Sequence, residues 1–493
     1  KRSVKKITNY LKKLIKMEIE TQSYITNLLK TNPKIVENNL NYNDKKFNKK
    51  KEYYQLKEHI DTFLEKESDD RFFIMPGLRG VGKTTIIYQL FSYLLNEKQI
   101  PKNRILYLNL ENLKDVPNFN IKEYIDVFLK DVNEAYPTVK NQVFIFVDES
   151  QYSKNWASLG KIIFDEDKNV FMIFTGSDAL NLEYNNDSAR RSLKKEIYPL
   201  NFAEYLYLKY DINYPDMLSE TFRDMIFTGK VNESQKIENR MYNQNLINLN
   251  QNYLKEWEYY IQYGCFPFTL NRTEESIVQL TLDMKDRIIE KDLDIITSFT
   301  TPIRLATYKL INIIAMSKPS ELSSNKLSNI LNISKTSIQS IFQALEKTHL
   351  LFHVEPYGSC VKRQRKSWEY YFLTSQIKAS IYIKNGLATQ NPKEYIANLS
   401  ENLVAASLFK LQQNRDFGIF YDPEKGGVDF LLNTIMGDII PIEVGIGAKN
   451  TKQVKKAISR YNSDYGIIVS NRSSRIQKED NIISIPLSTF SFM

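Results

Sequence analysis

The chain has 493 residues, of which 42% are hydrophobic, so it is long enough for about two to four domains and too apolar for a disordered polypeptide. Its two cysteines and three histidines are too few and too scattered to predict a zinc site. No apolar run approaches the roughly 18 residues that a membrane-spanning helix needs, so we expect a cytoplasmic protein with no membrane segment.

The net charge of +9 is concentrated near the N-terminus. Residues 1–60 contain 15 Lys or Arg and 6 Asp or Glu, an excess of nine positive charges, so the rest of the chain is close to neutral. Helical patterns over 3–31 and 53–66, joined by a polar linker, predict a basic helical N-terminal arm of residues 1–66. Two interpretations stay open: the arm contacts nucleic acid or an acidic partner, or it is a solvated helix with a lysine-rich linker.

Residues 72–90 read FFIMPGLRGVGKTTIIYQL and place a glycine-rich loop between a predicted strand and a predicted helix. This order is typical of a P-loop, whose glycines let backbone N–H groups surround phosphate oxygens. Lys83 is expected to reach the β- and γ-phosphates, and Thr84 is expected to offer its hydroxyl to Mg²⁺. The residues predicted to bind ATP in this loop are Gly77, Leu78, Arg79, Gly80, Val81, Gly82, Lys83, Thr84 and Thr85.

A second strand is predicted over 105–110, a helix over 121–136, and a third strand over 143–147 that ends in Asp148 and Glu149. An apolar strand followed by two acids is the Walker B pattern, and parallel strands deliver such acids beside the P-loop. We expect Asp148 to hold Mg²⁺ through water, beside the Thr84 hydroxyl, and Glu149 to act as the general base that polarises the attacking water.

The next predicted strand, residues 170–174, ends in Thr175-Gly176-Ser177. Thr175 or Ser177 is a candidate sensor of the γ-phosphate, although a plain strand-ending turn also explains these residues. Alternating strands and helices predict a doubly wound parallel α/β domain over 67–210. Arg190 or Arg191 is a candidate arginine finger, with a surface ion pair as the alternative; a finger acting in trans would require an oligomer.

These motifs, with the DE-x-Q sequence at 148–151, the paired arginines and a PLxFxEYL segment at 199–206, resemble archaeal and bacterial AAA-type ATPases (AAA+ superfamily, STAND-like) that carry DUF4143- or DUF234-type C-terminal regions. The resemblance covers most of residues 70–493. It implies a helical lid over the nucleotide, a winged helix and a nuclease-like C-terminal domain. We expect the lid over 211–300, with an Asn/Gln-rich insert at about 232–252 that forms a flexible excursion.

A winged helix-turn-helix pattern is predicted over 301–372. A helix over 303–316, a second over 321–331, a turn with Ser334 as N-cap, a third helix over 335–348 and an alternating strand follow one another. DNA contact is the functional interpretation, and a protein-interaction or purely structural module is the alternative. The residues predicted to contact DNA are Lys335, Thr336 and Gln339 on the third helix and Lys362, Arg363 and Arg365 at the wing.

Residues 385–493 resemble a PD-(D/E)xK nuclease domain, with Asp429 and Glu443 on neighbouring strands and Glu401 on an upstream helix. Such carboxylates would hold a second Mg²⁺ site. The lysine that normally follows two residues after the glutamate is replaced by Gly445, and Lys449 is a possible substitute. An active nuclease and a degenerate, non-cutting domain both remain open.

These features predict an ATP-binding, ATP-hydrolysing switch that couples nucleotide state to a DNA-binding winged helix and a nuclease-like domain. One alternative is an ATP-gated, Mg²⁺-dependent DNA nuclease. The other is a non-enzymatic signalling scaffold that binds protein partners.

Overall fold

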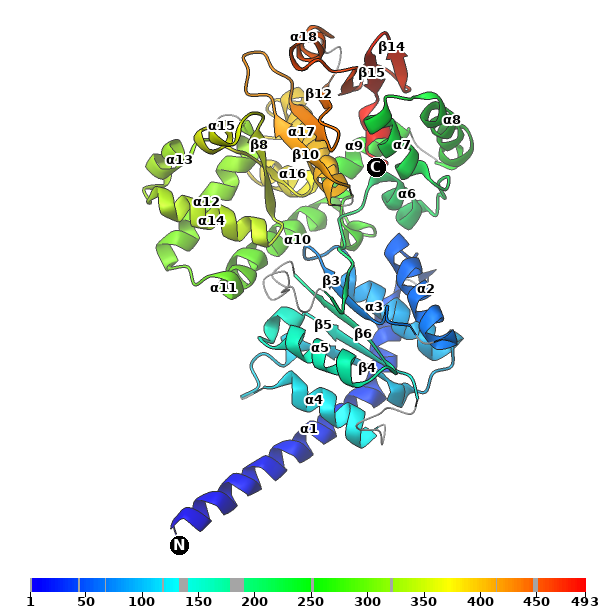
Figure 1. Cartoon of the computed structure of the whole chain (residues 1–493), viewed down its shortest axis with the longest axis vertical. Coiled ribbons are helices and arrows are strands. Elements are labelled where there is room, and N and C mark those ends of the chain that lie inside the picture. The colour runs from blue at the N-terminus through cyan, green and yellow to red at the C-terminus, as the bar shows by residue number, and fades with distance from the viewer. Residues whose placement is uncertain are drawn as a thin grey trace. The chain divides into compact units, whose positions relative to one another are not determined.

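The computed structural model describes residues 2–42, 45–66, 68–117, 119–132, 141–177, 190–249, 252–319, 322–413, 415–446 and 451–493 (Figure 1). The chain divides into two compact units. The N-terminal unit comprises Lys1–Leu78 and Gly82–Ile197, and the C-terminal unit comprises Arg79–Val81 and Tyr198–Met493. Each unit has its own large sheet.

The large sheet of the N-terminal unit has five strands in the order β4-β5-β6-β3-β7, and all its pairs are parallel. This confirms the predicted doubly wound α/β fold. Every residue of β5 and β6 is buried, which explains their uninterrupted apolar sequences. The strands are β3 Phe72–Pro76, β4 Ile105–Asn109, β5 Val143–Asp148, β6 Val170–Gly176 and β7 Leu193–Lys194.

The helices of this unit include the predicted N-terminal helix, which extends to Leu40 and packs onto the sheet. Ile25 and Leu29 belong to the main core, and the Asn32 side chain donates to the Tyr107 carbonyl oxygen at 2.9 Å. Residues 18–40 are therefore part of the N-terminal unit, not a separate arm. The helices are α1 Arg2–Leu40, α2 Lys51–Glu65, α3 Lys83–Ser92, α4 Ile121–Val127 and α5 Trp156–Glu166, with shorter turns η1 Tyr93–Glu97, η2 Lys102–Arg104, η3 Leu110–Asn112, η4 Phe128–Val132 and η5 Ser150–Tyr152 and a small pair of strands, β1 Asn41–Tyr42 and β2 Lys45–Lys46.

The sheet of the C-terminal unit has eight strands in the order β14-β15-β13-β12-β11-β10-β8-β9. Strand β8 pairs in parallel with β10 and antiparallel with β9, so the strands of the predicted winged-helix region, residues 301–372, share one sheet with the strands of residues 385–493. The strands are β8 Leu351–Pro356, β9 Glu369–Phe372, β10 Phe417–Tyr421, β11 Phe430–Thr434, β12 Ile439–Gly445, β13 Gly466–Ser470, β14 Gln477–Glu479 and β15 Ile482–Ile485.

The other regular elements described in the C-terminal unit are helices and short helical turns. The predicted N-cap is confirmed, because the Ser334 hydroxyl accepts the Ser337 N–H at 3.0 Å at the start of α14. Over the described ranges, no helix is both long enough and apolar enough to cross a membrane. The helices are α6 Phe202–Tyr210, α7 Leu218–Thr228, α8 Asn232–Arg240, α9 Tyr253–Tyr263, α10 Glu274–Arg287, α11 Leu293–Ile296, α12 Thr301–Met316, α13 Ser324–Leu331, α14 Lys335–Lys347, α15 Cys360–Arg365, α16 Ser375–Lys384, α17 Pro392–Gln412, α18 Thr451–Tyr461 and α19 Leu487–Phe490, with turns η7 Met241–Asn245, η8 Leu246–Asn248, η9 Pro267–Thr269 and η10 Ile288–Asp292.

The Asn/Gln-rich insert differs from the flexible excursion that we expected, because residues 232–248 are helical. Met241 and Tyr242 are buried, and the Glu238 carboxylate, 1% exposed, accepts the Ile476 N–H at 2.8 Å and the Thr489 hydroxyl. These hydrogen-bond partners come from the C-terminal segment, about 240 residues away, so the local composition gave no sign of them.

Candidate nucleotide-binding site

The P-loop turns sharply between the end of β3 and the start of α3. Gly80 and Gly82 have φ angles of 84° and 99°, in the left-handed region that residues with a Cβ rarely adopt. A Cβ at Gly80 would also lie 2.6 Å from the Phe268 ring. Glycine is therefore required at these positions for the loop to keep this backbone conformation.

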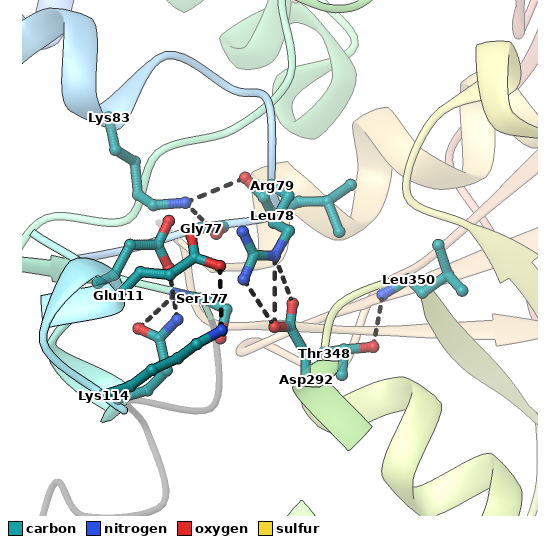
Figure 2. Close-up of polar contacts among 12 residues, drawn as sticks. Gly77, Leu78, Arg79, Lys83, Glu111, Lys114, Ser177, Asp292, Thr348 and Leu350 are labelled. Atoms are coloured by element: carbon teal, nitrogen blue, oxygen red, sulfur yellow. Dashed lines mark hydrogen bonds and ion pairs between the residues drawn. The ribbon is translucent and has the colours of Figure 1, made fainter. Parts of the chain in front are cut away.

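Lys83 is the first residue of α3 and is 5% exposed. Its ammonium donates to the Gly77 carbonyl oxygen at 2.6 Å and to the Leu78 carbonyl oxygen at 3.1 Å, as Figure 2 shows. These contacts hold the positive charge against the loop, which is where a P-loop lysine meets phosphate oxygens.

Asp148 lies at the carboxyl end of β5 and contacts two of the other predicted residues. The Thr84 hydroxyl donates to Asp148 Oδ2 at 2.8 Å, and the Thr175 hydroxyl donates to Asp148 Oδ1. A carboxylate and a threonine hydroxyl at the start of a P-loop helix are oxygen donors of the kind that Mg²⁺ prefers. The donor set therefore fits the predicted metal.

The Asp148 carboxyl is 1% exposed. Burial is the largest cause that raises its pKa, and the nearby Glu149 charge adds to the increase, whereas the two threonine hydroxyls and the Lys83 charge oppose it. The negative charge at Asp148 is thus only partly compensated by the protein, and a bound divalent cation would stabilise it.

Two further residues contact Asp148 that the sequence analysis did not predict. The Tyr107 hydroxyl donates to Asp148 Oδ2 at 3.2 Å, and the Asn109 amide lies 3.5 Å from the same oxygen. Asn109 is the register partner of Asp148 at the end of β4. The sequence did contain a signal for Asn109, because it is a polar residue at the end of an otherwise apolar strand.

Glu149 follows Asp148 in a left-handed conformation, with φ of 57°. Its carboxylate accepts a hydrogen bond from the Gln151 side-chain nitrogen, and the Gln151 side-chain oxygen accepts the Ser177 N–H at 3.3 Å. Of the two predicted sensor residues, Thr175 contacts Asp148 directly, and Ser177 is linked to Glu149 through Gln151.

The two arginines are not gathered with these residues. Arg191 donates from Nε to Asp165 Oδ1 at 2.6 Å, near the end of α5, and Arg190 is exposed. Leu193 pairs with Phe73 near the amino end of β3, whereas the P-loop follows its carboxyl end. Arg191 therefore makes the surface ion pair that was the alternative to a finger, and the role of Arg190 stays a prediction.

The predicted DNA-contacting residues on α14 lie on one exposed face. Lys335, Thr336 and Gln339 are exposed, whereas Ile338 and Ile341 on the opposite face are buried. This separation agrees with an outward-facing recognition helix.

The segment predicted as the wing contains the short helix α15. The Arg363 guanidinium lies 4.3 Å from the centre of the Phe420 ring and 3.8 Å from the Glu355 carboxylate. Arg363 is therefore half-buried against the sheet instead of extended into solvent. The side chains of Lys362 and Arg365 lie outside the described part of the chain.

The predicted nuclease acids are divided between the two faces of the C-terminal sheet. The Tyr371 hydroxyl lies 3.1 Å from the Glu401 carboxylate, and its ring packs against Phe430, the register partner of Ile442. Since neighbouring residues of a strand point to opposite faces, Glu443 lies on the face away from Glu401.

Asp429 accepts the Val444 N–H at Oδ2 over 2.6 Å, so its carboxylate also satisfies the neighbouring strand's backbone. Among the described residues, no three His, Cys, Asp or Glu side chains are close enough to hold a metal ion together. Lys449, the possible substitute for the missing lysine, lies outside the described residues. The second Mg²⁺ site at Asp429 and Glu443 stays a prediction.

A separate group of titratable side chains is buried between β9, α16 and α17. Burial, with the Glu401 charge as the second cause, raises the pKa of Glu369 to about 8. Burial lowers the pKa of Lys378 to about 8, and the Glu401 charge opposes that change. The Tyr371 hydroxyl lies 3.1 Å from both the Glu369 and the Glu401 carboxylates.

Family comparisons match three stretches of the chain. Residues 69–206 match an AAA domain, residues 254–380 match a domain of unknown function, DUF8612, and residues 397–490 match a domain of unknown function, DUF4143. The DUF4143 match confirms the predicted C-terminal resemblance.

An uncharacterized protein of Methanocaldococcus jannaschii, MJ1637, is 32% identical over 478 residues, which cover 96% of this chain and 94% of that protein. A second uncharacterized protein of that organism, MJ1544, is 30% identical over 139 residues, or 28% of each chain.

Solved structures resemble the chain more distantly. The Aeropyrum pernix ORC1 protein in complex with DNA is 11% identical, covers 69% of this chain and 93% of its own, and has a TM-score of 0.31. The Aeropyrum pernix ORC2 protein is 12% identical, also covers 69% of this chain and 93% of its own, and has a TM-score of 0.35. Because both scores are low, the assignment depends on the sequence matches and the site. The chain therefore belongs to the same family as MJ1637, and its two domain matches identify it as an AAA-type ATPase with a DUF4143 C-terminal domain.

Proposed function

We propose that this protein is an Mg²⁺-dependent ATPase that acts as a nucleotide-controlled switch. The observation that carries the proposal is the contact of Thr84, at the start of the P-loop helix, with Asp148, at the end of the Walker B strand, over 2.8 Å. The AAA domain match over residues 69–206 supports nucleotide binding independently.

Each residue of the site has a distinct role in this proposal. Lys83 exchanges its carbonyl partners for phosphate oxygens when ATP binds. Thr84 and Asp148 hold Mg²⁺, which when bound neutralises charge on the phosphates. Glu149 orients a water molecule and accepts its proton as the general base.

An ion pair at the apex of the P-loop supports the switch. Arg79 Nε lies 2.9 Å from Asp292 Oδ2, and Arg79 Nη2 lies 3.0 Å from Asp292 Oδ1, which is a bidentate geometry (Figure 2). Asp292 is 1% exposed and ends the turn η10. Arg79–Val81 belong to the C-terminal unit, whereas the loop residues on either side belong to the N-terminal unit. We propose that nucleotide binding changes the loop and thereby this ion pair, which passes nucleotide state to the C-terminal unit.

DNA is the partner that we propose for the C-terminal unit, and the exposed polar face of α14 is the observation that favours it. A non-cutting role is favoured over nuclease activity because Glu401 and Glu443 lie on opposite faces of the sheet. A protein partner bound by the same surface is the competing proposal, and an oligomer is required only if an arginine acts in trans.

Binding of a fluorescent ATP analogue and release of phosphate test the ATPase assignment. We expect Lys83→Ala to abolish binding, and Glu149→Gln to keep binding within about threefold while losing turnover by at least roughly 100-fold. Normal hydrolysis by the Glu149→Gln protein would show that Glu149 is not the base. Normal nucleotide affinity of the Lys83→Ala protein would contradict the phosphate-binding role of the loop.

A further inference from the structure

Gln151 connects two parts of the ATPase site, the Walker B acid Glu149 and the end of β6. It lies in the 3₁₀ turn η5, directly after the Walker B acids, and is 7% exposed. We infer that Gln151 is a positioning residue for hydrolysis, which holds the Glu149 carboxylate in a fixed relation to the end of β6. This inference rests on the proposed ATPase function.

The hydrogen bonds at the two ends of the Gln151 amide determine its orientation. The Ser177 backbone N–H can only donate, so it must face the amide oxygen, at 3.3 Å. The Glu149 carboxylate accepts at its Oε2 atom, so it must face the amide nitrogen. A glutamine satisfies both partners at once, whereas a glutamate would keep the Ser177 contact and place a second acceptor against Glu149.

Glu149 needs such support because its backbone is in an unfavourable conformation. A φ of 57° and a ψ of 45° lie in the left-handed region, which is uncommon for residues other than glycine, asparagine and aspartate. The turn that follows is closed by hydrogen bonds from Tyr152 N–H to the Glu149 carbonyl oxygen at 3.2 Å and from Ser153 N–H to the Ser150 carbonyl oxygen at 3.0 Å. This turn brings Gln151 back toward β6.

The end of β6 therefore contacts both Walker B acids by different routes. The Thr175 hydroxyl donates to Asp148 directly, and the Ser177 N–H reaches Glu149 through Gln151. A displacement of residues 175–177 on nucleotide binding would change the partners of the metal-binding acid and of the base together. Gln151 is the part of this arrangement that connects the base.

A double-mutant cycle tests the positioning role. Single-turnover hydrolysis and nucleotide binding are measured for the wild type, Gln151→Glu, Gln151→Leu, Glu149→Gln and the Glu149→Gln/Gln151→Glu protein. We expect both Gln151 variants to keep nucleotide affinity within about threefold and to hydrolyse on the order of 10- to 100-fold more slowly, because the base is misplaced. The double variant is expected to be no slower than Glu149→Gln, because Gln151 acts through Glu149.

Gln142→Glu is the matched control, since Gln142 directly precedes the same strand at its other end and donates to the Phe63 carbonyl oxygen. We expect its hydrolysis rate to stay within about twofold of the wild type. The near-isosteric Gln151→Glu variant is the main test if Gln151→Leu fails to fold.

Wild-type rates in the Gln151 variants, beside an inactive Glu149→Gln protein, would overturn the positioning role and leave the proposed function intact. Independent, additive losses in the double variant would also overturn it. Absence of hydrolysis by the wild type would instead defeat the proposed function itself.

Discussion

The N-terminal and C-terminal sheets each carry a pair of acidic residues at or beside buried strands. Asp148 and Glu149 follow a strand whose neighbours run parallel to it, so the polar ends of β4, β5 and β6 meet at one edge. Glu443 lies in β12, Asp429 directly precedes the antiparallel strand β11, and Glu401 lies on the face of that sheet away from Glu443. Strand direction and face, which acid spacing alone does not reveal, decide which acids converge.

The hydrogen-bond donors to the acids also differ between the two sheets. The Asp148 carboxylate accepts hydrogen bonds from the hydroxyls of Thr84 and Thr175. The oxygen atoms of this group are also available as metal ligands. Asp429 accepts the main-chain N–H of Val444, which joins the two strands. The first arrangement suits a ligand site, and the second stabilises the sheet.

The largest expected effect separates these two roles. We expect Asp148→Asn to lower Mg²⁺-dependent ATP hydrolysis by on the order of 100-fold or more, because the metal loses its carboxylate, and Asp429→Asn to leave the rate within about twofold. Phosphate release measures both rates.

Incubation with supercoiled plasmid and Mg²⁺, with and without ATP, is expected to show no cleavage. Cleavage that disappears in the Asp429→Asn protein would restore the nuclease interpretation.

An effect of similar size, on stability and not on hydrolysis, is expected at Asp292, whose carboxylate contacts Arg79 of the P-loop. Asp292→Asn removes the carboxylate that faces the Arg79 guanidinium, whose side chain is only 10% exposed, so we expect a loss of roughly 3 kcal/mol in the free energy of unfolding. Chemical denaturation measures this loss. Glu233→Gln is the control, because its ion pair with Lys236 is 73% and 75% exposed and exposed pairs contribute little. Equal, small effects of both variants would show that the Arg79 pair does not hold the loop.

The nucleotide site was largely predictable because its signals are local. The P-loop glycines, Lys83 and the acids after an apolar strand are each recognisable within ten residues, and parallel strands bring them together. The bond between Arg79 and Asp292 joins residues 213 positions apart, and no local pattern marks it. The role of Gln151 depends on a 3₁₀ turn that sends its side chain back to β6.

The C-terminal unit was less predictable for the same reason. Its eight-stranded sheet joins the hairpin β8–β9 to strands from a segment that we predicted as a separate domain. The Asn/Gln-rich insert is ordered by Glu238 contacts to residues about 240 positions later. Long-range pairing, not local propensity, determined both outcomes.

Acids in the C-terminal sheet should influence stability in a pH-dependent way. Glu369 has a pKa of about 8 in the folded chain against 4.5 for the ordinary side chain. Between these values the unfolded chain ionises while the folded chain keeps its proton, so wild-type stability falls as pH rises through this window. We expect Glu369→Gln to be more stable than the wild type by an amount that grows from pH 4.5 to about 8, reaches several kcal/mol, and then levels off.

Thermal and chemical unfolding across this pH range measure the Glu369 effect, and Glu479→Gln on the exposed strand β14 is the control. ATP hydrolysis by the Glu369→Gln protein is expected to stay at the wild-type rate. A loss of hydrolysis would show that the acids of this sheet participate in the reaction, which would remove the distinction between the two units.

The smallest expected effect concerns the exposed face of α14. If this face binds DNA, Lys335→Ala removes one phosphate contact at the start of the helix, so we expect the affinity to fall a few-fold and the slope of log K against log salt to decrease by about 0.9. Titration of labelled duplex DNA at several salt concentrations measures both quantities. Lys347→Ala, at the other end of the same helix, is the matched control and is expected to change neither, because the N-terminal part of a recognition helix contacts the groove. Equal changes in both variants would indicate non-specific attraction of a basic surface, and salt-independent or absent binding would assign the face to a protein partner.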